Sequence, residues 1–284
     1  MKFSRNYELS IELDTKTHDT IVIKPPLTLN FNIVRNTLAS ANTGTISIYN
    51  LAEANRKRIY QDRFDTTTYR RVVLRAGYGQ DLATIFRGNL RMAQSQRQGV
   101  DYVTELDSFD GGFGIINGFT SKTWPGGTDQ KKILGDIIKD MPNVILGKVG
   151  DFSGSSYRGT SLIGSPWSLI PGIAGDGSQP FIDNEVANVL KNNETLSGDI
   201  EVIEASTGLL ETPRRNDAVI EVKMLFEPRL VVGQVIELRS RETVYNGQYK
   251  VIGFTHSGTI SAAVNGQCTT TASLWIGSQK LKAA

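Results

Sequence analysis

Residues able to do acid–base or metal chemistry are few and widely separated. The chain has two histidines, His18 and His256, and one cysteine, Cys268. Neither histidine belongs to an H-E-x-x-H spacing, and Cys268 has no cysteine or histidine close in sequence, so no metal site is predicted. A Ser-His-Asp triad assembles from distant positions, but no G-x-S-x-G segment marks a nucleophile. We therefore predict no catalytic residue, no metal and no cofactor.

Paired carboxylates and glycine-rich runs also have simpler explanations. Asp107/Asp110 and Asp136/Asp140 are the close acidic pairs. Glycoside hydrolysis needs two carboxylates held across a sugar, and nothing in these spacings indicates such a geometry. The runs "DGGFGIINGF" and "GDFSGSSYRG" match neither the P-loop nor the dinucleotide-binding pattern. Turns and loops account for them.

A basic triplet, Arg56-Lys57-Arg58, raises the question of nucleic-acid binding. The whole chain has 31 Lys and Arg against 29 Asp and Glu, so no global field attracts DNA or an anionic membrane. On a helix, successive residues lie 100° apart, so the three cations cannot follow one phosphate backbone. We favour a solvated helix face, and we retain the triplet as a candidate for a local electrostatic interface.

The segment around this triplet predicts a strand that turns directly into a helix. Ile46 and Ile48 alternate with polar residues, whereas the residues after Leu51 have helical spacing. Asn50 is a favourable N-cap, and Glu53 three residues later completes a capping-box pattern. We expect Asn50 to end the strand and cap the helix.

Alternation of apolar and polar residues predicts strands at both ends of the chain. In "LTLNFNIVR", for example, Leu27, Leu29, Phe31 and Ile33 share one face. Asn246-Gly247 lies between two such segments and predicts a tight hairpin, because both residues accept positive φ. The remaining predicted strands are 7–13, 45–49, 71–78, 85–94, 100–106, 219–226, 230–240, 248–256 and 267–275.

The middle of the chain has a different pattern. "TDQKKILGDIIKDMP" places Ile133, Leu134, Ile137, Ile138 and Met141 at helical spacing before Pro142. "DNEVANVLKN" predicts a second helix, with Asp183 or Asn184 as its cap.

Between these two helices, 17 of the 31 residues from 150 to 180 are Gly, Ser or Pro, which predicts a long flexible loop. Aliphatic residues and a tryptophan occur along this loop, and a disordered linker has no need of such apolar side chains. Two readings stay open: an arm that docks on a partner, or a loop that folds back on its own domain. The candidate interface residues on the arm are Trp167, Leu169, Ile170 and Ile173.

Several motifs together resemble the tail-hub proteins of contractile-tailed bacteriophages. "ANTGTISIYNL" before a helix is similar to the first barrel of that family. "LFEPRLVVGQVIELRS", "YNGQYKVIGFTHSG" and "CTTTASLW" are similar to the second. There the turns Pro228 to Gly233, Asn246-Gly247 and His256-Ser257-Gly258 occur in the family's order. The stretch 150–180 has no match in the family, so the resemblance leaves the shape of the insert open.

The resemblance implies a mainly β fold with an α+β insert. Two tail-tube-like β-barrels would flank a small mixed domain. The expected limits are 1–120 for the first barrel, with its capped helix, 121–215 for the insert, with the loop 150–180, and 216–284 for the second barrel.

The function implied is structural: a trimeric baseplate hub that joins the hexameric tail tube to the trimeric central spike. The implied partners are further copies of the chain, the tail tube protein, the central spike protein and the tape measure protein, with DNA passing through the lumen. The location is the virion, at the tail tip, after assembly in the host cytoplasm. The single cysteine fits a reducing compartment, and no stretch approaches the ~18 apolar residues of a membrane span.

Three other readings remain beside the hub. One is a different tail-tip ring, such as a distal tail protein. Another is a carbohydrate-binding β module, which would gather exposed aromatic residues. The third is an enzyme such as a peptidoglycan hydrolase, which no acid–base constellation supports.

Overall fold

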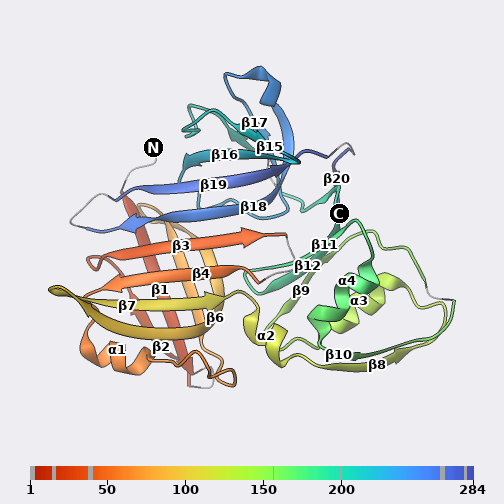
Figure 1. Cartoon of the computed structure of the whole chain (residues 1–284), viewed down its shortest axis with the longest axis horizontal. Helices are drawn as coiled ribbons and strands as arrows, with labels where there is room; N and C mark the ends of the chain where they lie inside the picture. The colour runs from red at the N-terminus through yellow and green to blue at the C-terminus, as the bar shows by residue number, and fades with distance from the viewer. Residues whose placement is uncertain are drawn as a thin grey trace.

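The computed structural model describes residues 4–14, 17–37, 41–155, 157–198, 200–262, 266–277 and 280–284. Most strands belong to one large, mainly antiparallel sheet of 13 strands (Figure 1). A small mixed domain, the insert, is attached beside this sheet. The predicted mainly β class with an α+β insert is confirmed.

The N-terminal strands follow the predicted alternation. In β3 the burial alternates along the strand, and Leu29, Phe31 and Ile33 enter the core. In Figure 1, β1 and β2 pass behind β3, β4 and β7, so that the sheet folds over a shared apolar core. The elements are β1 Arg5–Asp14, β2 Asp19–Ile23, β3 Leu29–Asn36, β4 Thr43–Tyr49, α1 Glu53–Ile59, β5 Arg71–Tyr78, β6 Asp81–Gln98 and β7 Asp101–Phe109.

The C-terminal strands extend the same sheet. β18 pairs with β3 from Gly253↔Asn36 to Ile260↔Leu29, so the two predicted sets of strands are joined edge to edge. This second lobe has its own apolar core, which includes Val222, Leu238 and Val251. Its elements are β13 Glu194–Thr195, β14 Glu201–Ile203, β15 Arg214–Asn216, β16 Val219–Leu225, β17 Val235–Leu238, the 3₁₀ helix η1 Thr243–Tyr245, β18 Gly247–Ile260, β19 Cys268–Trp275 and β20 Lys282–Ala283.

The insert packs two helices between small sheets. The predicted helix is α3, which begins after Asp129, whose side chain accepts a hydrogen bond from the Lys131 N–H. All five apolar residues predicted for its inner face and the following turn are buried. The elements are α2 Gly112–Asn117, β8 Thr120–Trp124, α3 Gln130–Ile138, β9 Ile145–Val149, β10 Thr160–Gly164, α4 Pro166–Ala174, β11 Ser178–Asp183 and β12 Val186–Lys191.

The prediction of one long flexible loop over 150–180 is wrong. This stretch contains β10, α4 and the start of β11. α4 has Pro166 in its first turn, where the missing N–H costs nothing, and Pro171 inside the helix. The composition of this stretch argued against a helix, because a proline inside a helix removes a backbone hydrogen bond. Packing of Trp167 and Ile170 into the insert core compensates for this lost hydrogen bond.

The helix predicted over "DNEVANVLKN" is also wrong. These residues form the turn and the second strand of a β-hairpin, in which β11 pairs with β12 from Ser178↔Lys191 to Asp183↔Val186. Asn184 and Glu185 both have positive φ, +54° and +64°, as a two-residue turn of type I′ requires. Of the residues that fit a helical face, Val189 and Leu190 are instead buried in the central strand β12, and Val186 is partly buried at its start.

Asn50 does not cap α1. Its φ is +56°, the N-cap position belongs to Ala52, and no side chain caps this helix. The Asn50 side chain instead accepts a hydrogen bond from the Tyr102 N–H and donates one to Asp101. It therefore ties the end of β4 to β7 rather than starting the helix.

Two predicted turns in the second lobe are also corrected. Gly247 is the first residue of β18, and a longer connection containing η1 links β17 to β18. His256-Ser257-Gly258 lies inside β18 and pairs with both β19 and β3. Glycine is needed at 258 because a Cβ there would lie 2.4 Å from the Cys268 sulfur.

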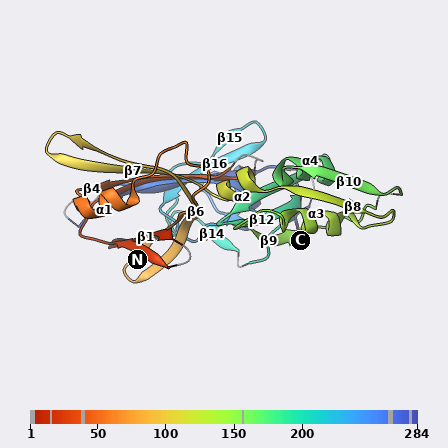
Figure 2. The ribbon, with the colours of Figure 1, turned by 90° about the horizontal axis from the view of Figure 1, so that it is seen from below.

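Seen from below, the molecule is elongated (Figure 2). The β6–β7 hairpin protrudes at one end, and the insert with α3, α4, β8 and β10 forms the other end. Within the described ranges, no helix is long and apolar enough to cross a membrane.

Candidate assembly site

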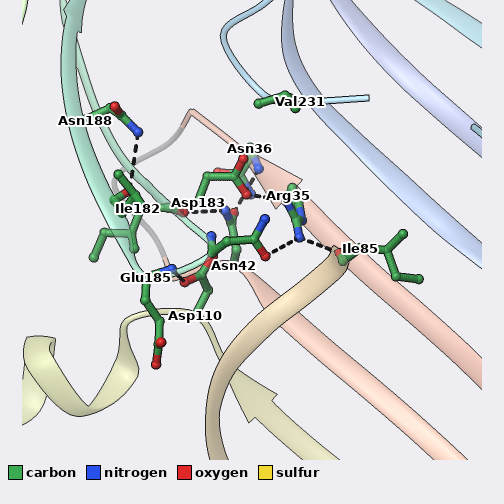
Figure 3. A network of polar contacts seen from close by, with 12 residues as sticks. Arg35, Asn36, Asn42, Ile85, Asp110, Ile182, Asp183, Glu185, Asn188 and Val231 are labelled. Atoms are coloured by element: carbon green, nitrogen blue, oxygen red, sulfur yellow. Dashed lines mark hydrogen bonds and ion pairs between the residues drawn. The ribbon is translucent and has the colours of Figure 1, made fainter. Parts of the chain in front are cut away.

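The insert is held to the large sheet by a buried polar network, drawn in Figure 3. Arg35, near the end of β3, is at its centre. Its guanidinium forms an ion pair with Asp183 and donates hydrogen bonds to Asn184 Oδ1, at 2.7 Å, and to the Ile85 carbonyl. These contacts connect β3, β6 and the β11–β12 turn. One arginine thus joins two strands of the first lobe to the insert.

Asp110 holds the same turn from the other side. It follows β7, and its carboxylate accepts the backbone N–H groups of Asn184 at 2.6 Å and Glu185 at 2.7 Å. Burial, reinforced by the nearby negative charge of Asp183, raises the pKa of Asp110 to about 7. Burial also raises the pKa of Asp183, against the opposing effect of Arg35.

Two further contacts complete the junction. Asn42 donates to the Ile182 carbonyl at 2.7 Å and accepts the Asn36 N–H at 2.9 Å. On the outer side, Glu185 forms an ion pair with Arg71 at 3.2 Å. Because Arg35 and Asp110 are almost completely buried, no substrate can reach them. This network is a structural clamp that sets the position of the insert.

The residues considered for catalysis are placed apart. His256 is buried beside Thr270 Oγ1, at 2.8 Å, and burial lowers its pKa well below the usual range. His18 is exposed and lies 3.5 Å from Glu12. Cys268 is buried and donates to the Thr259 carbonyl. Over the described ranges, no group of three His, Cys, Asp or Glu residues is arranged to hold a metal ion.

Of the paired carboxylates, Asp107, Asp136 and Asp140 are engaged in ion pairs, and Asp110 belongs to the buried network. Asp140 accepts a hydrogen bond from Lys122 at 2.6 Å, and Asp136 accepts one from the Trp124 indole at 3.1 Å. The two bonds fasten β8 to α3 and to the turn that follows it. Asp107 lies 3.6 Å from Arg91.

The three side chains of the basic triplet contact three separate partners, as expected for a solvated helix face. Arg58 pairs with Asp19 on β2 at 2.6 Å, and Lys57 pairs with Glu53 at 2.7 Å along the helix. The Arg56 guanidinium lies over the Tyr102 ring, 3.9 Å from its centroid. The role of these residues in an interface stays a prediction.

The four apolar interface candidates separate into two pairs. Trp167 and Ile170 are buried in the insert core, with exposed fractions of 8% and 0%. They are therefore not presented on an arm. Leu169 and Ile173 line an apolar hollow of about 540 Å³ between α3, α4 and β10, and none of the described residues that line it is charged. Trp124 is buried as well, so the exposed aromatic cluster expected of a carbohydrate-binding module does not form from these two tryptophans.

The sequence patterns missed the network and one exposed surface. Arg35, Asp110 and Asp183 are far apart in the chain, and no local spacing indicates that they meet. The surface lies on the two-stranded ribbon formed by β8 and β10. Ile163 belongs to β10, Phe119 directly precedes β8, and both side chains are exposed. Its signal was available in the alternation of "FTSKTW", where Phe119, Ser121 and Thr123 share a face.

Solved structures identify the fold as one found in phage tails. The chain matches the 43 kDa tail protein of prophage MuSo2 from Shewanella oneidensis with a TM-score of 0.64 and 8% identity, over 95% of this chain and 96% of that one. The tail protein from Neisseria meningitidis MC58 matches with 0.62 and 7% identity, over 96% and 97%.

A third similar structure comes from a secretion machine. It is an E. coli component of the type VI secretion system described as structurally similar to the T4 tail proteins gp27 and gp5, and it matches with a TM-score of 0.60 and 9% identity over 90% and 75% of the chains. Comparison with curated protein sequences found no match.

The family itself is established by sequence. The model of the family "Baseplate hub gp41" matches residues 8–257. This chain therefore belongs to the baseplate hub gp41 family, a structural component of the phage tail. The resemblance seen in the motifs is confirmed.

Proposed function

We propose that three copies of this chain form the hub at the tail tip, which joins the hexameric tail tube to the trimeric central spike during assembly and genome delivery. The observation that carries this proposal is the continuous sheet with two β lobes, each around its own core. Three subunits supply six lobes, which suits a sixfold tube on one side and a threefold spike on the other. The lumen of this ring passes the tape measure protein and then DNA.

The ends of the sheet support assembly with further subunits. β2, β14 and β15 are edge strands of the described sheet, and each pairs on one side only. Exposed edges are templates for pairing with another chain. The subunit is built in the host cytoplasm and ends in the virion, at the baseplate.

Light scattering on purified protein tests the proposal. A trimer of the 31.2 kDa chain has a mass of about 94 kDa. Micrographs of the protein mixed with the tail tube and spike proteins of the same phage should then show a threefold particle between them. A species that stays monomeric with both partners would refute the hub, and a sixfold ring would favour a distal tail ring.

A further inference from the structure

The outer edge of β6 continues beyond its last partner in the sheet. At Ala93 this edge is occupied, because Ala93 and Gln61 exchange two backbone hydrogen bonds of 3.0 and 3.1 Å. From Gln94 to Gln98, β6 pairs with β7 on one side, and no described residue pairs with its outer side. Successive residues of an antiparallel strand direct their backbone groups to opposite edges. The N–H and C=O groups of Ser95 and Arg97, like those of Ala93, therefore point to this free edge of β6.

A hollow lies beside the free edge of β6. It has a volume of about 680 Å³ and separates α1 from the β6–β7 hairpin, which extends beyond α1 in Figure 2. α1 and Tyr60 line one side of the hollow, and Gln94, Ser95 and Tyr102 line the other. Neighbouring strands in a sheet lie about 4.8 Å apart. An extended segment that enters this hollow is therefore within reach of the outward backbone groups of β6.

The cations around the free edge have no acidic partner. Arg56, Arg63 and Arg97 form no ion pair with any described residue; they contact an aromatic ring, a thioether and a backbone carbonyl. Of the described residues that line the hollow, only Glu53 is acidic, and Lys57 pairs with it at 2.7 Å. The free edge of β6 thus lies in an excess of positive charge.

We propose that an extended acidic segment of a partner protein adds to β6 as a further strand at Ser95 and Arg97. The backbone groups of these two residues hold the segment, and its carboxylates bind Arg56 and Arg97. A polypeptide suits this edge better than DNA does. The outward carbonyls need hydrogen-bond donors, which a phosphate backbone does not have. The inference does not depend on the proposed trimer.

Binding of a synthetic peptide tests the charge of the partner. The probe is a fluorescein-labelled peptide in which glutamate alternates with valine, and fluorescence anisotropy measures its binding to the purified protein. We expect a Kd below about 1 mM. Arg56→Gln or Arg97→Gln should raise this Kd about tenfold, the effect of losing one charge-assisted hydrogen bond. Arg241→Gln, at an exposed arginine of the second lobe, is the matched control and should leave the Kd unchanged.

A second peptide, with lysine in place of glutamate, should not bind. Equal binding of the two peptides, or binding of neither, overturns the proposal.

Substitutions at Ser95 separate strand addition from attraction between charges alone. Ser95→Pro removes the N–H that points to the free edge, which β7 does not use. Ser95→Ala loses the same side-chain contact with Thr104 and keeps this N–H. We expect Ser95→Pro to raise the Kd at least tenfold and Ser95→Ala to leave it unchanged. Equal binding by the two variants, each with an unchanged melting transition, overturns strand addition.

A modified peptide gives the same test without altering the protein. N-methylation of every residue keeps the carboxylates and removes the N–H groups that donate to the carbonyls of β6. This peptide should not bind, and binding as tight as that of the parent peptide refutes the added strand.

Other occupants of the free edge are outcomes of these experiments. A single-stranded oligonucleotide that binds more tightly than the acidic peptide, and less tightly to the Arg56 and Arg97 variants, would make the edge a nucleic-acid site and overturn the proposal. Wild-type dimers in light scattering that disappear in Ser95→Pro would make a second copy the occupant, with the same consequence. None of these results decides the trimer, so the hub is judged by its own experiment.

Discussion

The pH dependence of stability should reveal the buried carboxylate at the junction. The pKa of Asp110 is raised from 3.8 to about 7 by burial and by the charge of Asp183. Between these two pH values the folded protein keeps a proton that the unfolded chain has released. The free energy of unfolding therefore falls by about 1.4 kcal/mol per pH unit, and by about 4 kcal/mol in all, as pH rises from 4 to 7.

The Asp110→Asn variant isolates this effect, because an amide does not titrate there. One of the two acceptors for the Asn184 and Glu185 N–H groups is lost, which costs about 1–3 kcal/mol at every pH. We expect the variant to be less stable than the wild type at pH 4 and to gain about 4 kcal/mol on it by pH 7.5. Carboxylates outside this network titrate alike in both proteins and cancel in the difference.

Urea unfolding between pH 4 and pH 8, followed by tryptophan fluorescence, measures the difference. Asp107→Asn is the matched control, since Asp107 lies on β7 just before Asp110, beside Arg91 and outside the network. Stability curves of Asp110→Asn and the wild type that stay parallel within about 1 kcal/mol would refute the assignment of a proton to this site.

Three substitutions and one control test the remaining contacts. Arg35→Met leaves Asp183 buried without its cation, so we expect a loss of about 3–5 kcal/mol in urea unfolding at pH 7, and a loss under 1 kcal/mol would contradict the clamp. Trp167→Ala should cost about 3–5 kcal/mol, whereas a residue on a free arm would cost almost nothing. Gly258→Ala should cost about 1–3 kcal/mol in thermal unfolding, because the new Cβ meets the Cys268 sulfur. Gly172→Ala, where nothing lies within 4 Å, should be neutral or stabilising by comparison.

Local patterns were sufficient wherever burial on one face decided the structure. Leu29, Phe31 and Ile33 predicted β3 because a strand with one buried face must alternate. Ile133, Ile137 and their neighbours predicted α3 for the corresponding reason at a period of 3.6. The mainly β class, the mixed insert and the family followed from these segments and their order.

Local patterns failed where two structures share one composition. The residues Val186, Val189 and Leu190 fit either a helical face or a strand buried on both sides. Asn184 and Glu185 both adopt positive φ, which a helix does not allow and a tight hairpin turn requires. Asp110 accepts hydrogen bonds from the N–H groups of both turn residues. That partner is 74 residues away from Asn184, so no window of sequence contains it.

By itself, then, the sequence determined alternating strands such as β3, the helix α3, the β-rich class and the hub family, because the pattern of each segment shows which side avoids water. Only the tertiary structure decided that β18 pairs with β3 to make one sheet, that Arg35 and Asp110 clamp the insert, and that the ribbon face with Phe119 and Ile163 stays uncovered. These features arise from contacts between segments far apart in the chain, and their geometry exists only after the chain has closed on itself.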